Sequence, residues 1–97
     1  MNIEFNESND ANFALQWTGR PVEFIELSKA LFLSKSINNG KIEYKKMFFI
    51  LSKMFNVSIN NSHQAYTKMR GRTEDRTIFL NKLIECVIND MDEKDNK

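Results

Sequence analysis

The sequence predicts a mainly α-helical domain of four helices, with at most short strands. Three stretches, over residues 21–35, 43–55 and 74–90, repeat apolar residues at helical spacing. A fourth and more polar stretch, over residues 59–70, lies between turn-forming residues and completes the set. Because a chain of 97 residues provides at most one core, the four helices are expected to form a single domain.

The domain is expected to span residues 13–92. Residues 1–12 are mostly polar and are predicted to form a flexible lead-in, and the charged residues 93–97 are predicted to form a disordered tail. Short strand pieces could form near residues 15–17 and 37–42, the second around an Asn-Gly turn signal.

The predicted helices have recognisable starts and apolar faces. Pro21 suits a first helical position, because its missing N–H would be unpaired there anyway. Ser58 and Thr73 are expected to cap the third and fourth helices, since hydroxyl oxygens accept bonds from free N–H groups. The strongly apolar second helix is predicted to be central. The expected core residues are Trp17, Phe24, Leu27, Leu31, Phe48, Leu51, Phe55, Phe79, Leu83 and Val87.

Positive charge is concentrated in one part of the chain. The formal net charge is only +1, yet residues 41–82 contain nine Lys or Arg against three acids, whereas the remainder contains five against ten. Segregation of this kind favours a nucleic-acid partner. Ordinary scatter of surface charge is the alternative.

The third predicted helix is interpreted as a reader of the DNA major groove. A helix, a short break and a second helix with a basic exposed face are typical of helix-turn-helix domains. Asn and Gln side chains match adenine edges, and Arg and Lys match guanine or phosphate. The base-reading candidates are Asn61, Gln64, Thr67 and Lys68. The phosphate-contact candidates are Lys45, Arg70, Arg72 and Arg76.

Two simpler interpretations of the same residues stay open. The third helix could be an ordinary surface helix. Arg72 or Arg76 could pair within the chain with Glu74, Asp75 or an acid of the first helix.

The sequence contains no convincing catalytic or metal-binding pattern. The single histidine, His63, has no nucleophile placed beside it and is expected on the solvent side of its helix. There is no phosphate-binding glycine motif and no cluster of metal ligands. We therefore expect a non-enzyme without a metal or cofactor.

The lone Cys86 excludes an internal disulfide and fits a reducing compartment. No apolar run approaches the roughly 20 residues of a membrane span. A cytoplasmic location without membrane contact is expected.

Six short motifs occur in a recognisable order. They are Trp17-Thr18-Gly19, Glu26-Leu27 with Ala30-Leu31, Ile37-Asn38-Asn39-Gly40, Phe55-Asn56-Val57, Arg70-x-Arg72, and Arg76-Thr77-x-Phe79-Leu80. Over residues 17–92, this ordered set resembles the C-terminal domain of the RteC family, which regulates excision of conjugative transposons in Bacteroides-type bacteria.

The resemblance implies a winged-helix or helix-turn-helix-like domain that binds DNA near a promoter. Two features differ from the family pattern. The family's larger N-terminal domain has no counterpart in this sequence, and Glu74 and Asp75 follow Arg72-Thr73, where the family often has a basic pair.

These observations favour a DNA-binding transcriptional regulator, with double-stranded DNA as its partner. The alternative is a small helical adaptor that binds proteins and not DNA. A homodimer or a partner domain is expected for tight specific binding, because paired half-sites add their contacts.

Overall fold

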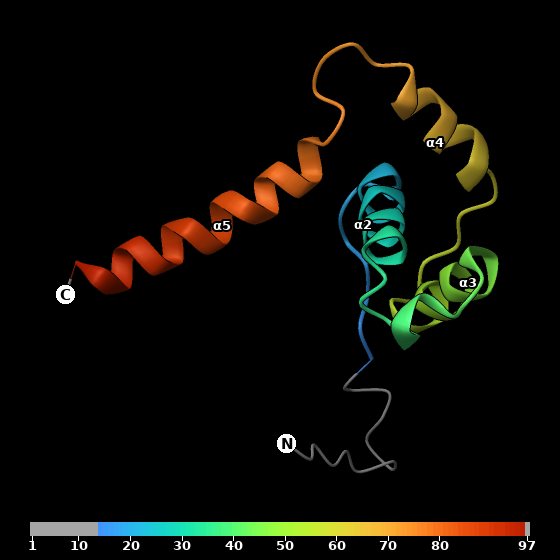
Figure 1. The fold of residues 1–97 in the computed structure, drawn as a ribbon, viewed down its shortest axis with the longest axis horizontal. Helices are drawn as coiled ribbons and strands as arrows, with labels where there is room; N and C mark the ends of the chain where they lie inside the picture. Colours follow the sequence, from blue (N-terminus) through green and yellow to red (C-terminus); the bar gives the residue numbers. More distant parts are fainter. Residues whose placement is uncertain (1–13, 97) are drawn as a thin grey trace.

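The computed structural model describes residues 14–96, which form four α-helices and one short 3₁₀ helix. The helices are α2 (Pro21–Ser34), α3 (Tyr44–Met54), α4 (Ser62–Arg70) and α5 (Ile78–Asp95), with η2 (Asn38–Gly40) between α2 and α3. Figure 1 shows α2 in the middle of the molecule, with the other three α-helices around it. Within the described residues, α3, α4 and α5 each approach α2 closely and do not approach one another. The predicted four-helix, mainly α fold is confirmed.

Helix α2, which lies over the first predicted helical range, is the centre of the core. The prediction that the second range, now α3, is central is wrong, because α3 packs on α2 alone among the described α-helices and leaves Phe49, Ile50 and Met54 exposed.

The first turn of α2 is closed by the Glu23 side chain, whose Oε1 accepts a hydrogen bond from the Arg20 N–H at 2.9 Å. Phe24 and Ile25 are each only 1% exposed. Because these side chains belong to the helix that all the others pack against, they anchor the domain.

An aromatic cluster joins α2 to the ends of α3 and α5. The Trp17 ring lies edge-on to Phe24, Phe55 and Phe79, at centroid distances of 5.2, 6.0 and 5.7 Å. Such edge-to-face pairs add attraction beyond the burial of ring area. Val87, which lies two turns after Phe79 on α5, was also predicted to be a core residue. It is 53% exposed, so this prediction is wrong.

The segment before α2 is extended but forms no strand. The Trp17 N–H donates to the Phe55 carbonyl at 2.8 Å, and the amides of Gln16 and Asn56 bond beside it. This single backbone bond is too little for a ladder. Residues 37–42 likewise form no strand, since Asn38 and Asn39 adopt left-handed φ values of 53° and 56° within the turn.

Helices α4 and α5 begin later than predicted. Asn61 and Thr77 occupy the positions before them, in place of the expected caps Ser58 and Thr73. Residues 71–77 form a turn in which Asp75 has φ 55° and the Arg72 guanidinium donates to the Asp75 carbonyl at 3.3 Å. A positive φ cannot continue a right-handed helix, so α5 starts only after this turn.

The α3–α4 pair differs from a compact helix-turn-helix. The two helices are joined by residues 55–61, a longer link than the 3–4-residue turn of that motif. Both helices pack on α2 rather than on each other. The described residues also contain no strand pair that could form a wing.

Helix α5 runs away from the rest of the molecule (Figure 1). Only its beginning packs into the core, where Phe79 is 9% exposed. The helix continues to Asp95, past residue 90, where we expected it to end, and through positions 93–95 of the expected disordered tail.

A buried carboxylate fixes the start of α5. Glu26 is 7% exposed, and its Oε2 accepts a hydrogen bond from the Leu80 N–H at 2.7 Å. Leu80 lies in the first turn of α5, where N–H groups have no partner within the helix. Negative charge is also favoured at a helix N-terminus by the helix dipole. Glu26 therefore caps α5 from a neighbouring helix.

Lys29 of α2 links two further helices. Its ammonium group lies 4.1 Å from the ring centroid of Tyr44 on α3 and 4.8 Å from that of Tyr66 on α4. Cation–π contacts of this kind are attractive, more so when partly desolvated. Burial, with a contribution from the nearby Tyr66, raises the pKa of Tyr44 to about 12.

We predict that Glu26→Ala lowers the free energy of unfolding by about 1–3 kcal/mol, because the Leu80 N–H is left buried without a partner. Amide hydrogen exchange at the start of α5 should accelerate in the same variant. Ser28→Ala is the matched control: Ser28 is 1% exposed on the same helix, but its Oγ has no hydrogen-bond partner among the described residues. Equal losses in denaturant unfolding of the two variants would contradict the capping role of Glu26.

We predict that Tyr44 makes the domain less stable at alkaline pH. The folded chain holds the Tyr44 proton more tightly than the unfolded chain, in which the tyrosine pKa is about 10. Its contribution is therefore present below pH 10 and is lost as the pH rises from about 10 to about 12. Urea midpoints measured across this range should fall more steeply for the wild type than for Tyr44→Phe. Parallel curves would show that Tyr44 is not responsible.

Candidate nucleic-acid interface

Helix α4 presents one face to α2 and the opposite face to solvent. Met69 is 4% exposed, and Ala65 and Tyr66 are half-buried beside it. Gln64 and Lys68 lie on the exposed side. Because α4 packs on α2 along one edge only, the side chains of Gln64 and Lys68 are left facing solvent.

The four base-reading candidates are all exposed. Gln64, Thr67 and Lys68 share one side of α4, and Asn61 lies at the position before its first residue. The Thr67 hydroxyl donates to the His63 carbonyl at 2.9 Å, so its oxygen is left as an acceptor. His63 itself is exposed.

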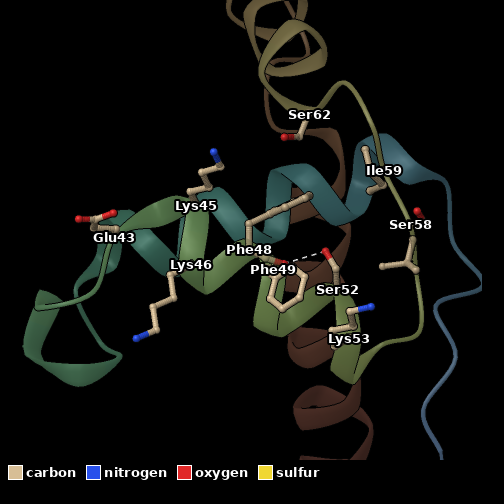
Figure 2. A pocket seen from close by; sticks show the side chains of 11 residues that line it. Glu43, Lys45, Lys46, Phe48, Phe49, Ser52, Lys53, Ser58, Ile59 and Ser62 are labelled. Atoms are coloured by element: carbon tan, nitrogen blue, oxygen red, sulfur yellow. Dashed lines mark hydrogen bonds between the residues drawn. The ribbon is translucent and has the colours of Figure 1, made fainter.

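A basic groove adjoins the beginning of α4. It encloses about 630 Å³ between α3 and the segment that leads into α4. Figure 2 shows Lys45, Lys46 and Lys53 around it, with one carboxylate, that of Glu43, and with Ser58 and Ser62. The hydroxyl of Ser52 also borders the groove but donates to the Phe48 carbonyl at 2.7 Å. We call this feature the α3 groove. Ammonium and hydroxyl groups are the side-chain donors that commonly contact phosphate oxygens.

The three lysines of the α3 groove share one side of α3 with an aromatic ring. Phe49 is 61% exposed, and the Lys53 ammonium lies 5.3 Å from its ring centroid. Positions 45, 46, 49 and 53 fall within a third of the helical circumference. Sequence reasoning selected only Lys45; the same helical spacing would have added Lys46, Phe49 and Lys53.

The other phosphate-contact candidates lie elsewhere. Arg70 and Arg76 line a hollow of about 470 Å³ between α2, α4 and α5, together with Lys29, Leu33 and Leu80. We call this the basic hollow. Three of the four predicted phosphate contacts are therefore divided between two places: Lys45 lines the α3 groove, and Arg70 and Arg76 line the basic hollow.

The whole chain was compared with known protein families. The model of the RteC protein family matches residues 2–95. The chain belongs to the RteC family. No curated protein and no solved structure matches it.

In this RteC-family chain, the turn between α4 and α5 holds the remaining candidate. Arg72 is half-buried, and its only side-chain hydrogen bond to a described residue is to the Asp75 carbonyl. Among residues 14–96, no ion pair joins Arg72 or Arg76 to Glu74 or Asp75. The expected alternative of carboxylate pairing is not seen in this part of the chain.

The described part of this RteC-family chain holds no group of three or more His, Cys, Asp or Glu side chains placed to bind a metal ion. None of its helices has the length and apolar character needed to cross a membrane.

Proposed function

We propose that this RteC-family chain binds double-stranded DNA and acts in transcriptional control of conjugative-transposon excision. One observation carries the proposal: the exposed polar face of α4 adjoins the α3 groove with its three lysines. The family's role in excision supplies the biological setting.

In this proposal, α4 contacts base edges and the α3 groove contacts the backbone. The Gln64 amide can both donate to and accept from an adenine, which suits a bidentate contact in the major groove. Lys45, Lys46 and Lys53 neutralise phosphates and contribute affinity without sequence preference.

In a compact helix-turn-helix the two helices pack on each other, but here the long α3–α4 link keeps them apart. Because α3 and α4 are each held by α2, the relative position of reader and lysines depends on α2 packing. Ser58 and Ser62, in the link and at the start of α4, border the same groove and bring hydroxyl donors next to the lysines.

The second candidate function is a protein-binding adaptor without DNA binding. A specific observation favours it: five large apolar side chains on α5 are about half exposed. A DNA contact does not require such a surface. The DNA-binding function would use α4, whereas the adaptor function would use α5.

We predict that Lys53→Ala weakens binding to all duplexes alike and lowers the slope of log affinity against log salt by about one unit, because one phosphate contact is lost. Lys82→Ala, at an exposed position of α5 that borders neither the α3 groove nor the basic hollow, is the control with the same change in charge. Fluorescence anisotropy with random duplexes over a salt series measures both. If the wild type shows no salt-dependent binding at low salt, the DNA proposal is wrong and the adaptor function replaces it.

We predict that Gln64→Ala changes specificity rather than the salt slope. Loss of a bidentate base contact should reduce discrimination at one base pair by about 1–3 kcal/mol. The measurement compares wild type and variant on a duplex enriched from a random pool and on its single-base variants. Unchanged discrimination at every position would contradict a reading role for this face of α4.

A further inference from the structure

Helix α5 has an apolar face that no described residue covers. Ile84, Val87, Ile88 and Met91 are 56%, 53%, 49% and 57% exposed, and with Leu83 they line a shallow apolar hollow. Their spacing places them on one side of the helix. We call this set the α5 stripe. A continuous exposed apolar surface in a small domain usually marks an interaction site.

The α5 stripe continues into the basic hollow. Leu80 lies on the same side of α5, one turn before Ile84, and borders the basic hollow together with Leu33 of α2. The hollow also holds three cationic side chains, those of Lys29, Arg70 and Arg76, against one carboxylate, that of Glu26. At the start of α5, the apolar stripe therefore lies directly beside the positively charged side chains of the basic hollow.

The other end of α5 carries the opposite charge. Residues 90–95 contain four acids and one lysine, and the lysine, Lys94, already pairs with Asp90 at 2.7 Å. One helix therefore presents an apolar stripe between a basic neighbourhood at its beginning and an acidic segment at its end.

We propose that the α5 stripe binds the α5 stripe of a second copy of this chain, with the two helices antiparallel. A twofold axis beside Val87 places Leu83 of each copy opposite Met91 of the other. The acidic ends then lie beside the basic hollows, and both apolar stripes are covered together. The same surface on each copy is complementary to itself, as a twofold dimer requires.

Charge decides the direction of pairing. Parallel helices would set the acidic segments side by side and leave both basic hollows, in which three cations face the single carboxylate of Glu26, away from them. Antiparallel helices also place each helix dipole against the opposite end of its neighbour. The 18-residue helix is about 27 Å long at 1.5 Å per residue, so its end reaches the start of the partner helix.

The first experiment measures the oligomeric state of the whole 97-residue chain without DNA. Sedimentation equilibrium should show a monomer–dimer equilibrium, and Ile84→Asp should raise its dissociation constant at least about tenfold, since a carboxylate would be buried within the apolar contact. Asn89→Asp is the matched control on the opposite, exposed side of α5 and should leave the constant unchanged. A chain that is monomeric at all concentrations overturns the proposal, as does a dimer that Ile84→Asp does not weaken.

Disulfide cross-linking tests the direction. In a Cys86→Ser background, Val87→Cys should form a covalent dimer with itself, because both copies lie at the axis. Met91→Cys should not, since its two copies would be separated by about 12 Å along the helix axis, beyond the roughly 7 Å between Cα atoms that a disulfide can join. Self-cross-linking of Met91→Cys would overturn the antiparallel arrangement.

Dimerisation does not depend on DNA binding, so either of the two proposals can be wrong while the other holds. Gln64→Ala should leave the dimer unchanged. Arg76→Ala should weaken it several-fold in the absence of DNA, an effect that a purely phosphate-contacting arginine would not have. An unchanged dissociation constant for Arg76→Ala would show that the basic hollow takes no part.

Discussion

The packing of three helices on α2 is the constraint on which the rest of the structure depends. Phe24 and Ile25 are almost completely buried on this helix, and Glu26, next to them, holds the first turn of α5. Lys29 one turn later lies against aromatic rings of α3 and α4. Two successive turns of α2 thus join every other α-helix of the described chain.

This arrangement explains the shape of the candidate DNA interface. Because α4 is held through one edge, its polar face is free, and because α3 is held separately, its lysines are grouped in a groove beside the start of α4. A compact helix-turn-helix couples its two helices directly. Here the two helices are linked through α2, because each packs on α2 and not on the other.

Membership of the RteC family and the exposed stripe of α5 fit together in the proposed regulator. A single small module makes few phosphate contacts, and pairing of two modules adds contacts to two half-sites. Helix α5 points away from α3 in Figure 1, and the residues that line the α3 groove belong neither to α5 nor to the basic hollow.

The sequence by itself determined the number of helices, their approximate ranges and the family. Helical spacing of apolar residues is a local signal, and it identified Phe24 and Phe79 as core residues and the α4 side as polar. Family motifs added the RteC assignment, which the family match over residues 2–95 confirms.

Only the tertiary structure decided how these elements are used. The periodicity of apolar residues could not distinguish the buried Phe79 from the exposed Val87 on the same helix. Only the first part of α5 packs on α2, and the sequence does not show where that contact ends. Nor could it show that Glu26 caps a helix 54 residues away, since that bond joins distant parts of the chain. The division of the basic residues between the α3 groove and the basic hollow has the same origin: charge is counted along the sequence, but its position in space is set by packing on α2.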